Sequence, residues 1–366
     1  MTVLKWLGGL ISMATLLAAA LAAEDTPTWS YPGATWEKIT NPSDLGFSDQ
    51  ELAHLTSFLE TQNTQGLHVS VGGKEVFSYG DPSANGYIAS VRKSVLAMLY
   101  GPYVADGTID LDKTIGELGL TDVGGLLDIE KRATIRHIIS ARSGVYHAAS
   151  NGGDSAADAP RRGTKQPGSF YLYNNWDFNA AGAIFEKLTG KDIFQALNDQ
   201  FAMPLQFEDF DLATHQKSGN PERSKFLAYH MNLSARDLGR LGHFMLSKGR
   251  WQGDQIIPAD WVDEMVLPHT PHSEMFPASF KDQGMQYGYM WWVLDDASLP
   301  LAYKGAYAGR GHFGQYLAVI PALDMVVGHK TKPVRYSSAE EYAAVRVTWE
   351  QFKMILDHLV AARLSP

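Results

Sequence analysis

Cysteine is absent from this chain of 366 residues. Its absence excludes disulfide bonds, catalysis by a thiolate and metal sites built from cysteine, and it fits either a reducing or an oxidising compartment. Runs of lysine and arginine are also missing, and the formal net charge is −9 at pH 7. Because nucleic acids and anionic membrane surfaces attract basic patches, we expect neither of them as a partner.

Two common designs of hydrolase are missing as well. The chain has no Gly-x-Ser-x-Gly turn, which disfavours an α/β-hydrolase. His269 and His272 are separated by a proline and lack a neighbouring helix that carries glutamate, so we interpret this stretch as a loop and not as a zinc site. We therefore expect no metal and no other cofactor.

The chain begins with an apolar segment. Lys5 precedes an uncharged run from Trp6 to Ala23 that is rich in leucine and alanine and ends in small residues. This pattern predicts a secretory signal peptide over residues 1–22, cleaved after Ala22, and hence export to the periplasm or the medium. A single membrane anchor is the alternative, because about 18 uncharged residues can just span a bilayer.

The rest of the chain is long enough for one large domain. We predict an irregular arm over residues 23–45 and a domain over residues 46–366. The apolar residues recur at helical spacing over residues 107–285, and strand patterns lie on both sides. The predicted fold is α/β (α+β): an antiparallel sheet from residues 46–106 and 286–366, flanked by helices and interrupted by a mostly helical insertion. A ligand cleft is expected at the junction.

Individual elements follow from periodicity and end signals. Ser48 to Glu51 matches a capping box, so a helix should run from there to about Thr61. The other predicted elements are strands at 67–71, 75–79, 287–294, 301–307, 316–320 and 325–329, and helices at 134–140, 177–189, 234–248, 258–265 and 339–362.

Ser90 and Lys93 stand three residues apart at the start of an apolar helix predicted from Ser90 to Tyr100. Residues at this spacing share one helix face, so their side chains should touch. A lysine in a desolvated pocket loses its charge readily and can take the proton of a serine hydroxyl, which makes the serine a nucleophile. The free N–H groups at the helix start would stabilise a developing oxyanion. The alternative is an ordinary helix start, with Ser90 as its cap and Lys93 in solvent.

Tyr173-Asn174-Asn175 is the one Tyr-x-Asn sequence in the chain, and it lies in a loop before a predicted helix. A phenol beside a lysine can be tuned to accept a proton, and an amide can hold a substrate carbonyl. Tyr173 and Asn175 are therefore candidates for the same site. The alternative is a packed tyrosine followed by an asparagine that caps the helix.

A glycine-rich stretch, Gly309 to Gln315, precedes a predicted strand. It satisfies the Gly-x-Gly-x-x-Gly pattern of dinucleotide-binding folds, but that pattern requires a helix after it, so we reject a dinucleotide site. We predict instead an edge strand whose His312 faces the cleft and whose Gly314 lets a substrate approach the backbone, because glycine has no side chain to block it.

Together these stretches resemble the serine β-lactamase and penicillin-binding superfamily, whose members share a β-lactamase/transpeptidase-like fold. The superfamily's three motifs occur here in the same order and at similar spacing: Ser90-x-x-Lys93, Tyr173-x-Asn175 and His312-x-Gly314. The Tyr-x-Asn form resembles class C β-lactamases and related esterases. Further stretches resemble β-lactamase-related hydrolases, including 6-aminohexanoate-dimer hydrolases: Ile138 to Gly144, Asn232 to Leu238, Gly249 to Val262 and Tyr287 to Trp292.

The resemblance implies a role for each candidate residue. Ser90 would be the acylated nucleophile and Lys93 its proton acceptor. Tyr173 would move the proton to the leaving group and later activate water. Asn175 would hold the substrate amide or ester, and the backbone N–H groups of Ser90 and Gln315 would form the oxyanion hole.

One departure from the family pattern concerns the substrate. β-Lactamases usually carry Lys-Thr-Gly where this chain has His312-Phe313-Gly314, and the nearby Lys330-Thr331-Lys332 lacks the glycine. Histidine is mostly neutral near pH 7, so a permanent cation for a β-lactam carboxylate is missing at that position. We expect an exported serine hydrolase that cleaves small-molecule esters or amides, with weak or no β-lactamase activity. The alternatives are a β-lactamase or D-alanyl peptidase acting on peptidoglycan-like substrates, and a catalytically idle relative that binds such a ligand.

Overall fold

The computed structural model describes residues 29–153, 155–294, 297, 299–333 and 337–364. Tyr31 to Pro366 belong to one compact unit. The predicted signal peptide and its cleavage site lie outside the described residues. Among the residues that are described, no helix is both long enough and apolar enough to span a bilayer.

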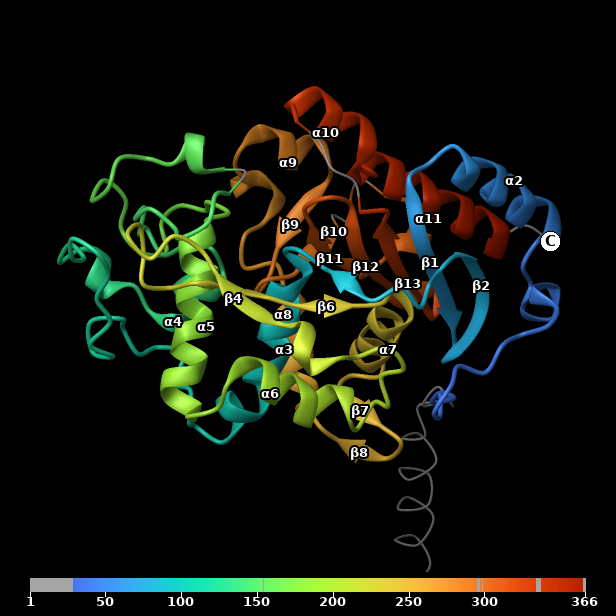
Figure 1. Ribbon diagram of the computed structural model, residues 1–366, viewed down its shortest axis with the longest axis horizontal. Coiled ribbons are helices and arrows are strands. Elements are labelled where there is room, and N and C mark those ends of the chain that lie inside the picture. The colour runs from blue at the N-terminus through green and yellow to red at the C-terminus, as the bar shows by residue number, and fades with distance from the viewer. Residues whose placement is uncertain (1–28, 154, 295–296, 298, 334–336, 365–366) are drawn as a thin grey trace, which may run out of the picture. The chain divides into compact units, whose positions relative to one another are not determined.

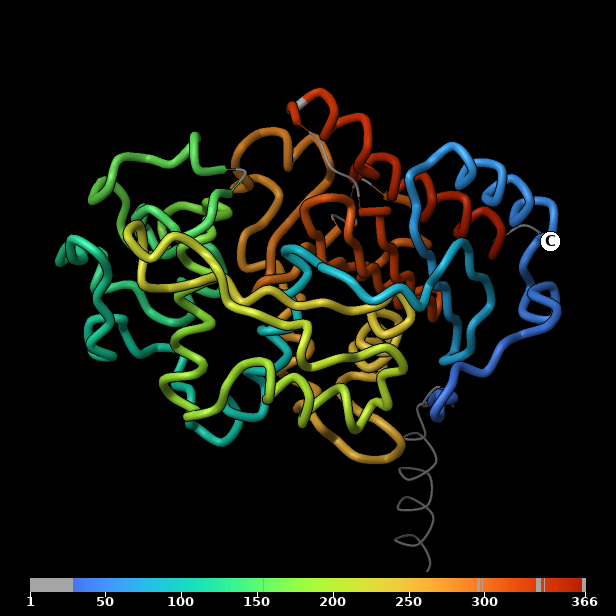
Figure 2. Tube along the Cα trace, in the orientation of Figure 1, coloured from blue at the N-terminus to red at the C-terminus, as the bar shows by residue number. Residues whose placement is uncertain are grey.

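A seven-stranded antiparallel sheet is built from both ends of the domain (Figure 1). Its order is β2-β1-β13-β12-β11-β10-β9. In Figure 2 the tube of β1, from the first part of the chain, lies beside that of β13, from the last part, and the two strands pair antiparallel. This arrangement confirms the predicted fold class. The strands are β1 (Thr64–Val71), β2 (Lys74–Gly80), β9 (Met285–Tyr287), β10 (Trp292–Leu294), β11 (Tyr307–Gly311), β12 (Gln315–Ile320) and β13 (Met325–Thr331).

One face of the sheet is covered by the helix that ends the described chain. In α11 (Trp349–Leu364), the ring of Phe352 stacks on Tyr316 of β12 with 4.4 Å between the ring centroids. Helix α2 (Asp49–Glu60) packs beside α11 and buries its leucines there (Figure 1). The capping box predicted at its start is present in part, since the Ser48 side chain accepts a hydrogen bond from the backbone N–H of Glu51.

The other face carries α3 (Val91–Ala105) and α7 (Ala235–Leu246) (Figure 1). Helix α7 lies so close to the sheet that a Cβ atom at Gly242 would stand 2.2 Å from Cγ1 of Val326 on β13. Only glycine permits this approach. Helix α3 packs against β11 and β12, so the start of α3 comes to the end of β11.

Most of the remaining elements lie between residues 107 and 285, where the sequence predicts a mostly helical insertion. One helix of this segment, α7, lies on the sheet. The other elements are α4 (Ile135–Ile139), α5 (Asn175–Thr189), α6 (Ile193–Leu197), α8 (Ala259–Val266) and α9 (Ala278–Asp282), with the short paired strands β3 (Gly86–Tyr87) and β6 (Asn232–Leu233), β4 (Gln216–Ser218) and β5 (Ala228–His230), and β7 (Arg250–Trp251) and β8 (Asp254–Gln255).

The single strand predicted at residues 287–294 is wrong, because the chain reverses within it. A turn separates β9 from β10, and Met290 in this turn has φ +58°. A Cβ atom at Gly288 would lie 2.1 Å from the carbonyl oxygen of Met265, so glycine is required there. Alternating apolar residues do not show where a strand folds back on itself.

The single helix predicted at residues 339–362 is also wrong. The chain forms α10 (Ala339–Val345) and then α11, which has a start signal of its own. The backbone N–H of Gln351 donates to Oγ1 of Thr348, and the N–H of Thr348 donates to Oε1 of Gln351. This reciprocal pair is a capping box, a signal that is readable in the sequence.

The edge strand predicted to carry His312 is wrong as well. The strand predicted over residues 301–307 starts only at Tyr307, as β11, and this strand lies inside the sheet, whose edges are β2 and β9. His312, Phe313 and Gly314 form the turn between β11 and β12, with Gln315 opposite Gly311 in the ladder. Phe313 and Gly314 have φ +66° and +78°.

Candidate active site

Ser90 stands immediately before α3, and Lys93 lies in the first turn of that helix. The Ser90 side chain does not cap the helix, and Lys93 is only 1% exposed. The alternative of a capping serine with a solvated lysine is therefore excluded. Ala89 has φ +48°, an unfavourable value for alanine, and turns the chain sharply before Ser90.

The ammonium group of Lys93 is held by the two residues of the Tyr-x-Asn sequence. Its Nζ donates to the hydroxyl oxygen of Tyr173 and to Oδ1 of Asn175, both at 2.7 Å. Nζ also lies 4.1 Å from the centroid of the Tyr173 ring and 4.3 Å from that of Phe178. The two groups are therefore close enough for a proton to pass between them.

Tyr173 and Asn175 reach this position from the start of α5. Asn174 caps the helix, because its Oδ1 accepts a hydrogen bond from the backbone N–H of Trp176 at 3.0 Å. The capping role expected in the alternative thus belongs to Asn174, which leaves the Asn175 side chain for Lys93 and for the carbonyl oxygen of Gly152. The Tyr173 ring packs 5.2 Å from that of Trp292.

The opposite side of the site is the turn after β11. Gly311, the last residue of β11, would place a Cβ atom 2.5 Å from the carbonyl oxygen of Ile88, so the strand approaches the chain before Ser90 only because Gly311 has no side chain. Gly314 lines a cavity beside Ser90, and its role in substrate approach stays a prediction. A Cβ atom there would meet Oγ1 of Thr331 at 2.4 Å, so the glycine serves the packing and positive φ of the turn.

Two neighbouring cavities open beside Ser90. Ser90, Tyr173, His312 and Phe313 line both of them, and Asn175 lines one. Gly314 lines the other, between β11 and α11. Gln315 lines neither and lies instead in a further cavity behind Phe313. The structure thus brings Ser90, Lys93, Tyr173, Asn175 and His312 together, while the oxyanion-hole role of the Gln315 backbone N–H stays a prediction.

Arginines supply cations that the sequence analysis missed. Arg310 and Arg346 line the cavity shared by Ser90 and α11. The Arg310 guanidinium lies between the rings of Trp292 and Trp349, with Cζ 4.8 Å and 4.5 Å from their centroids. Its Nη2 donates to Oε1 of Gln283, and its buried Nη1 has no hydrogen-bond partner among the described residues. Burial lowers the pKa of Arg310. An arginine side chain is ordinarily a cation at neutral pH, because its unperturbed pKa lies far above 7.

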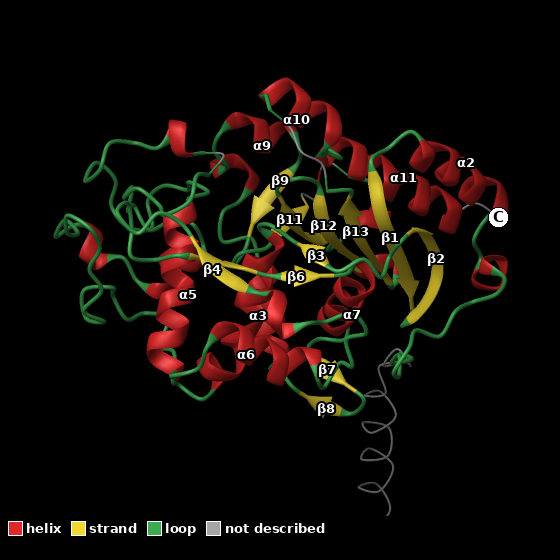
Figure 3. Cartoon of the chain, viewed as in Figure 1, coloured by secondary structure: helices red, strands yellow, loops and turns green. Residues whose placement is uncertain are grey.

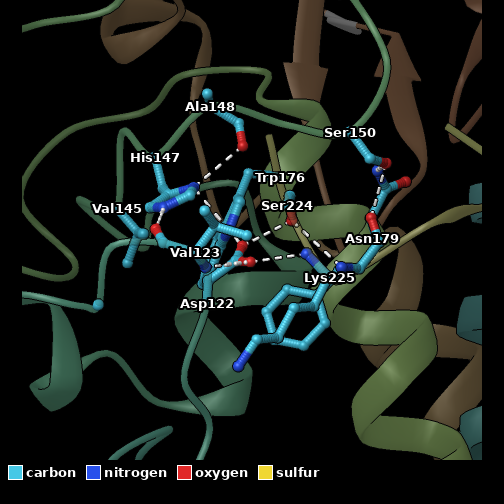
Figure 4. A network of polar contacts seen from close by, with 12 residues as sticks. Asp122, Val123, Val145, His147, Ala148, Ser150, Trp176, Asn179, Ser224 and Lys225 are labelled. Carbon is cyan, nitrogen blue, oxygen red and sulfur yellow. Dashed lines mark hydrogen bonds and ion pairs between the residues drawn. The ribbon is translucent and has the colours of Figure 1, made fainter. Parts of the chain in front are cut away.

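A buried carboxylate behind the site secures the first turn of α5 (Figure 4). Asp122 accepts hydrogen bonds from Nε1 of Trp176 at 2.7 Å, from Oγ of Ser224 at 2.6 Å and from the backbone N–H of Lys225 at 2.7 Å. Burial alone would raise the pKa of Asp122, but these donors outweigh it and lower the pKa. Trp176 directly follows Asn175, so the network helps to place the Asn175 side chain.

A second residue of α5 links that helix to α3. Oδ1 of Asn179 accepts a hydrogen bond from Arg92 at 3.4 Å, and Nδ2 of Asn179 donates to Oδ1 of Asn151 at 2.8 Å. Arg92 lies between Ser90 and Lys93 in sequence, and Asn151 lines a Ser90 cavity. The two helices that carry the candidate residues are therefore joined by polar contacts as well as by packing.

Comparison with known families identifies the chain. The model of the β-lactamase family matches residues 54–332. The chain belongs to the β-lactamase family. This confirms the resemblance found in the sequence, and members of this family are generally serine hydrolases.

Relatives of this β-lactamase-family chain agree with the fold. An uncharacterized protein of Alkalihalophilus pseudofirmus is 24% identical over 268 residues, which cover 66% of this chain and 71% of that protein. A Bacillus anthracis structure assigned as a 6-aminohexanoate-dimer hydrolase has a TM-score of 0.63 at 18% identity, covering 92% of this chain and 88% of the other. EstCE1, a hydrolase with promiscuous acyltransferase activity, has a TM-score of 0.59 at 16% identity, covering 87% and 99%. A penicillin-binding protein homologue from Caulobacter crescentus has a TM-score of 0.55 at 16% identity, covering 78% and 92%.

Sequence reasoning missed Gly311 and Arg310, although the signal for the glycine was present. Gly309 and Gly311 are two residues apart, so they lie on one face of β11. A Cβ atom at Gly309 would also crowd α3, at 3.1 Å from Cγ1 of Val91. Two glycines at this spacing mark a strand face that another backbone approaches closely. No local signal pointed to Asp122, whose partners are distant in sequence.

Proposed function

We propose that the chain is a serine hydrolase that cleaves ester or amide bonds of small molecules through an acyl-enzyme on Ser90. The observation that carries the proposal is the 2.7 Å hydrogen bond from Lys93 to Tyr173, next to cavities that Ser90 lines. The family to which the chain belongs supports hydrolysis as the general reaction. The substrate class rests on the site alone.

In the first half-reaction the Ser90 oxygen attacks the substrate carbonyl carbon while its proton passes to the Lys93–Tyr173 pair. The bond from the carbonyl carbon to the leaving group then breaks, and Tyr173 delivers that proton to the leaving alcohol or amine. The Ser90 backbone N–H at the start of α3 would stabilise the oxyanion. Asn175 would orient the substrate.

In the second half-reaction a water molecule replaces the leaving group. Tyr173 takes a proton from the water while the water oxygen attacks the acyl carbon. The bond between the acyl carbon and the Ser90 oxygen then breaks. The proton returns to Ser90, and a carboxylic acid is released. The close hydrogen bond between Lys93 and Tyr173 allows the pair to take up and return one proton in each half-reaction.

The test compares wild type and Ser90→Ala with p-nitrophenyl acetate and p-nitrophenyl butyrate. We expect a burst of p-nitrophenol from wild type and its loss in Ser90→Ala. Ser94→Ala is the matched control: Ser94 lies one turn further along α3, where its hydroxyl donates to the carbonyl oxygen of Met290 at 2.7 Å, and its loss should leave the burst in place. Equal rates in wild type and Ser90→Ala would instead support an idle ligand-binding relative.

A second candidate function is favoured by the two cavity arginines. Arg310 and Arg346 could bind the carboxylate of a β-lactam or of a D-alanyl peptide, a role for which the sequence analysis found no cation at His312. Nitrocefin and a D-alanyl-D-alanine peptide therefore belong in the same assay. Turnover of either one faster than of both esters would make a β-lactamase or D-alanyl peptidase the better assignment.

We also propose that the protein is exported, as the sequence of residues 1–22 predicts. Mass measurement of the protein recovered from the periplasm or medium of a bacterial host checks this. A mass that corresponds to cleavage after Ala22, give or take a residue, supports export with processing. Recovery of the full-length chain from the cytoplasm alone contradicts it.

A further inference from the structure

The end of β13 carries the sequence Lys330-Thr331-Lys332, which the proposed mechanism does not use. Lys330 and Thr331 are 2% and 4% exposed, whereas the next residue, Lys332, is exposed. Successive residues of a strand point to opposite faces of the sheet. The buried Lys330 and Thr331 side chains therefore contact different parts of the structure.

The ammonium group of Lys330 holds the chain that leads to Ser90. Its Nζ donates to the carbonyl oxygens of Gly86 at 2.5 Å, Tyr87 at 3.1 Å and Leu233 at 3.0 Å. Three N–H donors thus meet three acceptors, which is the full capacity of an ammonium group. Gly86 and Leu233 pair across β3 and β6, the two short strands labelled in Figure 3, so Lys330 fastens this pair to the main sheet.

Thr331 holds the opposite wall of the site. Its Oγ1 donates to the carbonyl oxygen of Gly314 at 3.0 Å, and a ring nitrogen of His329 lies 2.9 Å from the same oxygen. Gly314 ends the turn that contains His312. Two consecutive residues of one rigid strand therefore fasten the chain before Ser90 and the turn that faces it.

Burying the Lys330 side chain at the end of β13 is energetically unfavourable. Burial lowers the pKa of Lys330 to about 7, so the fold penalises its charged form. An uncharged side chain of the same length would avoid that penalty but would leave the carbonyl oxygens of Gly86, Tyr87 and Leu233 without their donor. Lys330 therefore contributes its three hydrogen bonds here, and not only the volume of its side chain.

We propose that Lys330 and Thr331 are positioning residues that set the distance between Ser90 and the His312–Gly314 turn. The proposal rests on the proposed function, because it concerns how well the Ser90 oxygen meets a substrate bound in the cavities. Neither residue is assigned to touch the substrate. A displacement of about 1 Å in such a site can lower the rate a hundredfold.

The test compares Lys330→Met with Lys332→Met, a matched control that makes the same substitution two residues away on an exposed side chain. Rates with p-nitrophenyl butyrate are divided by the number of active sites, counted from the burst, so that unfolded protein does not contribute. We expect kcat per site to fall about tenfold or more in Lys330→Met, with KM changed less than twofold. Lys332→Met should stay within twofold of wild type.

Thr331→Val provides an independent readout, because valine keeps the shape of threonine and removes only the hydrogen bond to Gly314. We expect a smaller fall in kcat per site, about threefold to tenfold, and this variant keeps the proposal testable should Lys330→Met fail to fold. The proposal is overturned if either folded variant only melts at lower temperature while kcat per site stays at the wild-type value. Failure of the proposed function would look different, since Ser90→Ala would then match wild type.

Discussion

The two walls of the Ser90 cavities are built in different ways. On one wall the candidate reacting groups come from helices: Ser90 and Lys93 from α3, Asn175 from α5, and Tyr173 from the residue pair before α5. Lys93 is almost fully buried and donates hydrogen bonds of 2.7 Å to Tyr173 and Asn175. The other wall is the three-residue turn at 312–314, which belongs to neither of its flanking strands.

The two walls are expected to have different roles, one in the reaction and the other in substrate binding. The helical wall is supported by core packing and by the hydrogen bonds that Asp122 accepts. The turn is held at a few points by its neighbours: the Tyr342 hydroxyl accepts a hydrogen bond from the backbone N–H of Phe313 at 3.3 Å, and Thr331 donates to Gly314. Changes in the helical wall should therefore abolish turnover. Removal of a side chain that the turn presents to the cavity should alter substrate affinity, whereas a shift of the whole turn relative to Ser90, as in Thr331→Val, should lower kcat.

The largest expected effect comes from substitution of Lys93 and Tyr173, the pair proposed to accept the Ser90 proton. Lys93→Met should lower kcat/KM for p-nitrophenyl butyrate by about a thousandfold or more, and Tyr173→Phe by about a hundredfold or more. Because the two groups act as one unit, the double variant should lose little beyond Lys93→Met alone. Steady-state rates of the four proteins make this double-mutant cycle.

The matched control for this cycle is Tyr171→Phe. Tyr171 is buried two residues before Tyr173, and its hydroxyl has no hydrogen-bond partner among the described residues. Removal of that hydroxyl should leave kcat/KM within about twofold of the wild-type value. Independent, additive losses in Lys93→Met and Tyr173→Phe would show that the two groups do not share a proton, and the assignment of the helical wall would fail.

The helical wall was also the part that the sequence predicted best, and the reason is physical. Ser90 and Lys93 are three residues apart at the start of a helix, so their placement on one side of it is predictable from local geometry. The Tyr-x-Asn sequence identified Tyr173 and Asn175 as candidates. It did not show that Asn174 caps α5 while the Asn175 side chain contacts Lys93. The fold class followed from strand patterns at both ends of the domain.

The turn could not be predicted, because its position depends on contacts between distant segments. The glycine pattern was visible, but its meaning required the pairing of β11 with β12 and the approach of Ile88. The φ of +78° at Gly314 and its close approach to Thr331 are further reasons for glycine there, and they were not visible in the sequence. The same pairing places Gln315 opposite Gly311, and the oxyanion-hole role of its backbone N–H stays a prediction.

The support of the helical wall can be tested with two buried carboxyl groups that differ in their donors. Asp122 accepts three hydrogen bonds from other segments, whereas the donors to Asp177 on α5 come from Ser143 alone, through its Oγ at 2.6 Å and its backbone N–H. Burial raises the pKa of Asp177 well above its ordinary value, and the Ser143 hydrogen bonds only partly oppose this. Urea unfolding at pH 7 should show Asp122→Asn to be about 2 kcal/mol less stable than wild type and Asp177→Asn to be no less stable.

The pH dependence of these two variants has opposite sign. The pKa of Asp122 is lower in the folded protein than in the unfolded one, so its stabilisation is present above about pH 4 and is lost as the pH falls through the folded value. The pKa of Asp177 is raised in the folded protein, so the wild type loses stability as the pH rises above about 4. The stability of Asp177→Asn relative to wild type should therefore increase over that range. Parallel curves for both variants would contradict this account of how α5 is supported.

The smallest expected effect is at the turn itself. His312 stacks on Tyr342 with 4.5 Å between ring centroids, and a 3.0 Å hydrogen bond joins its Nδ1 to the Tyr342 hydroxyl. His312→Ala should raise KM for p-nitrophenyl butyrate about threefold and leave kcat within about twofold, because a neutral hydrogen bond contributes about 1 kcal/mol. Tyr342→Phe keeps the stacked ring and should change KM less. A hundredfold loss of kcat in His312→Ala would place the imidazole among the reacting groups, and the division between a chemical wall and a binding wall would then be wrong.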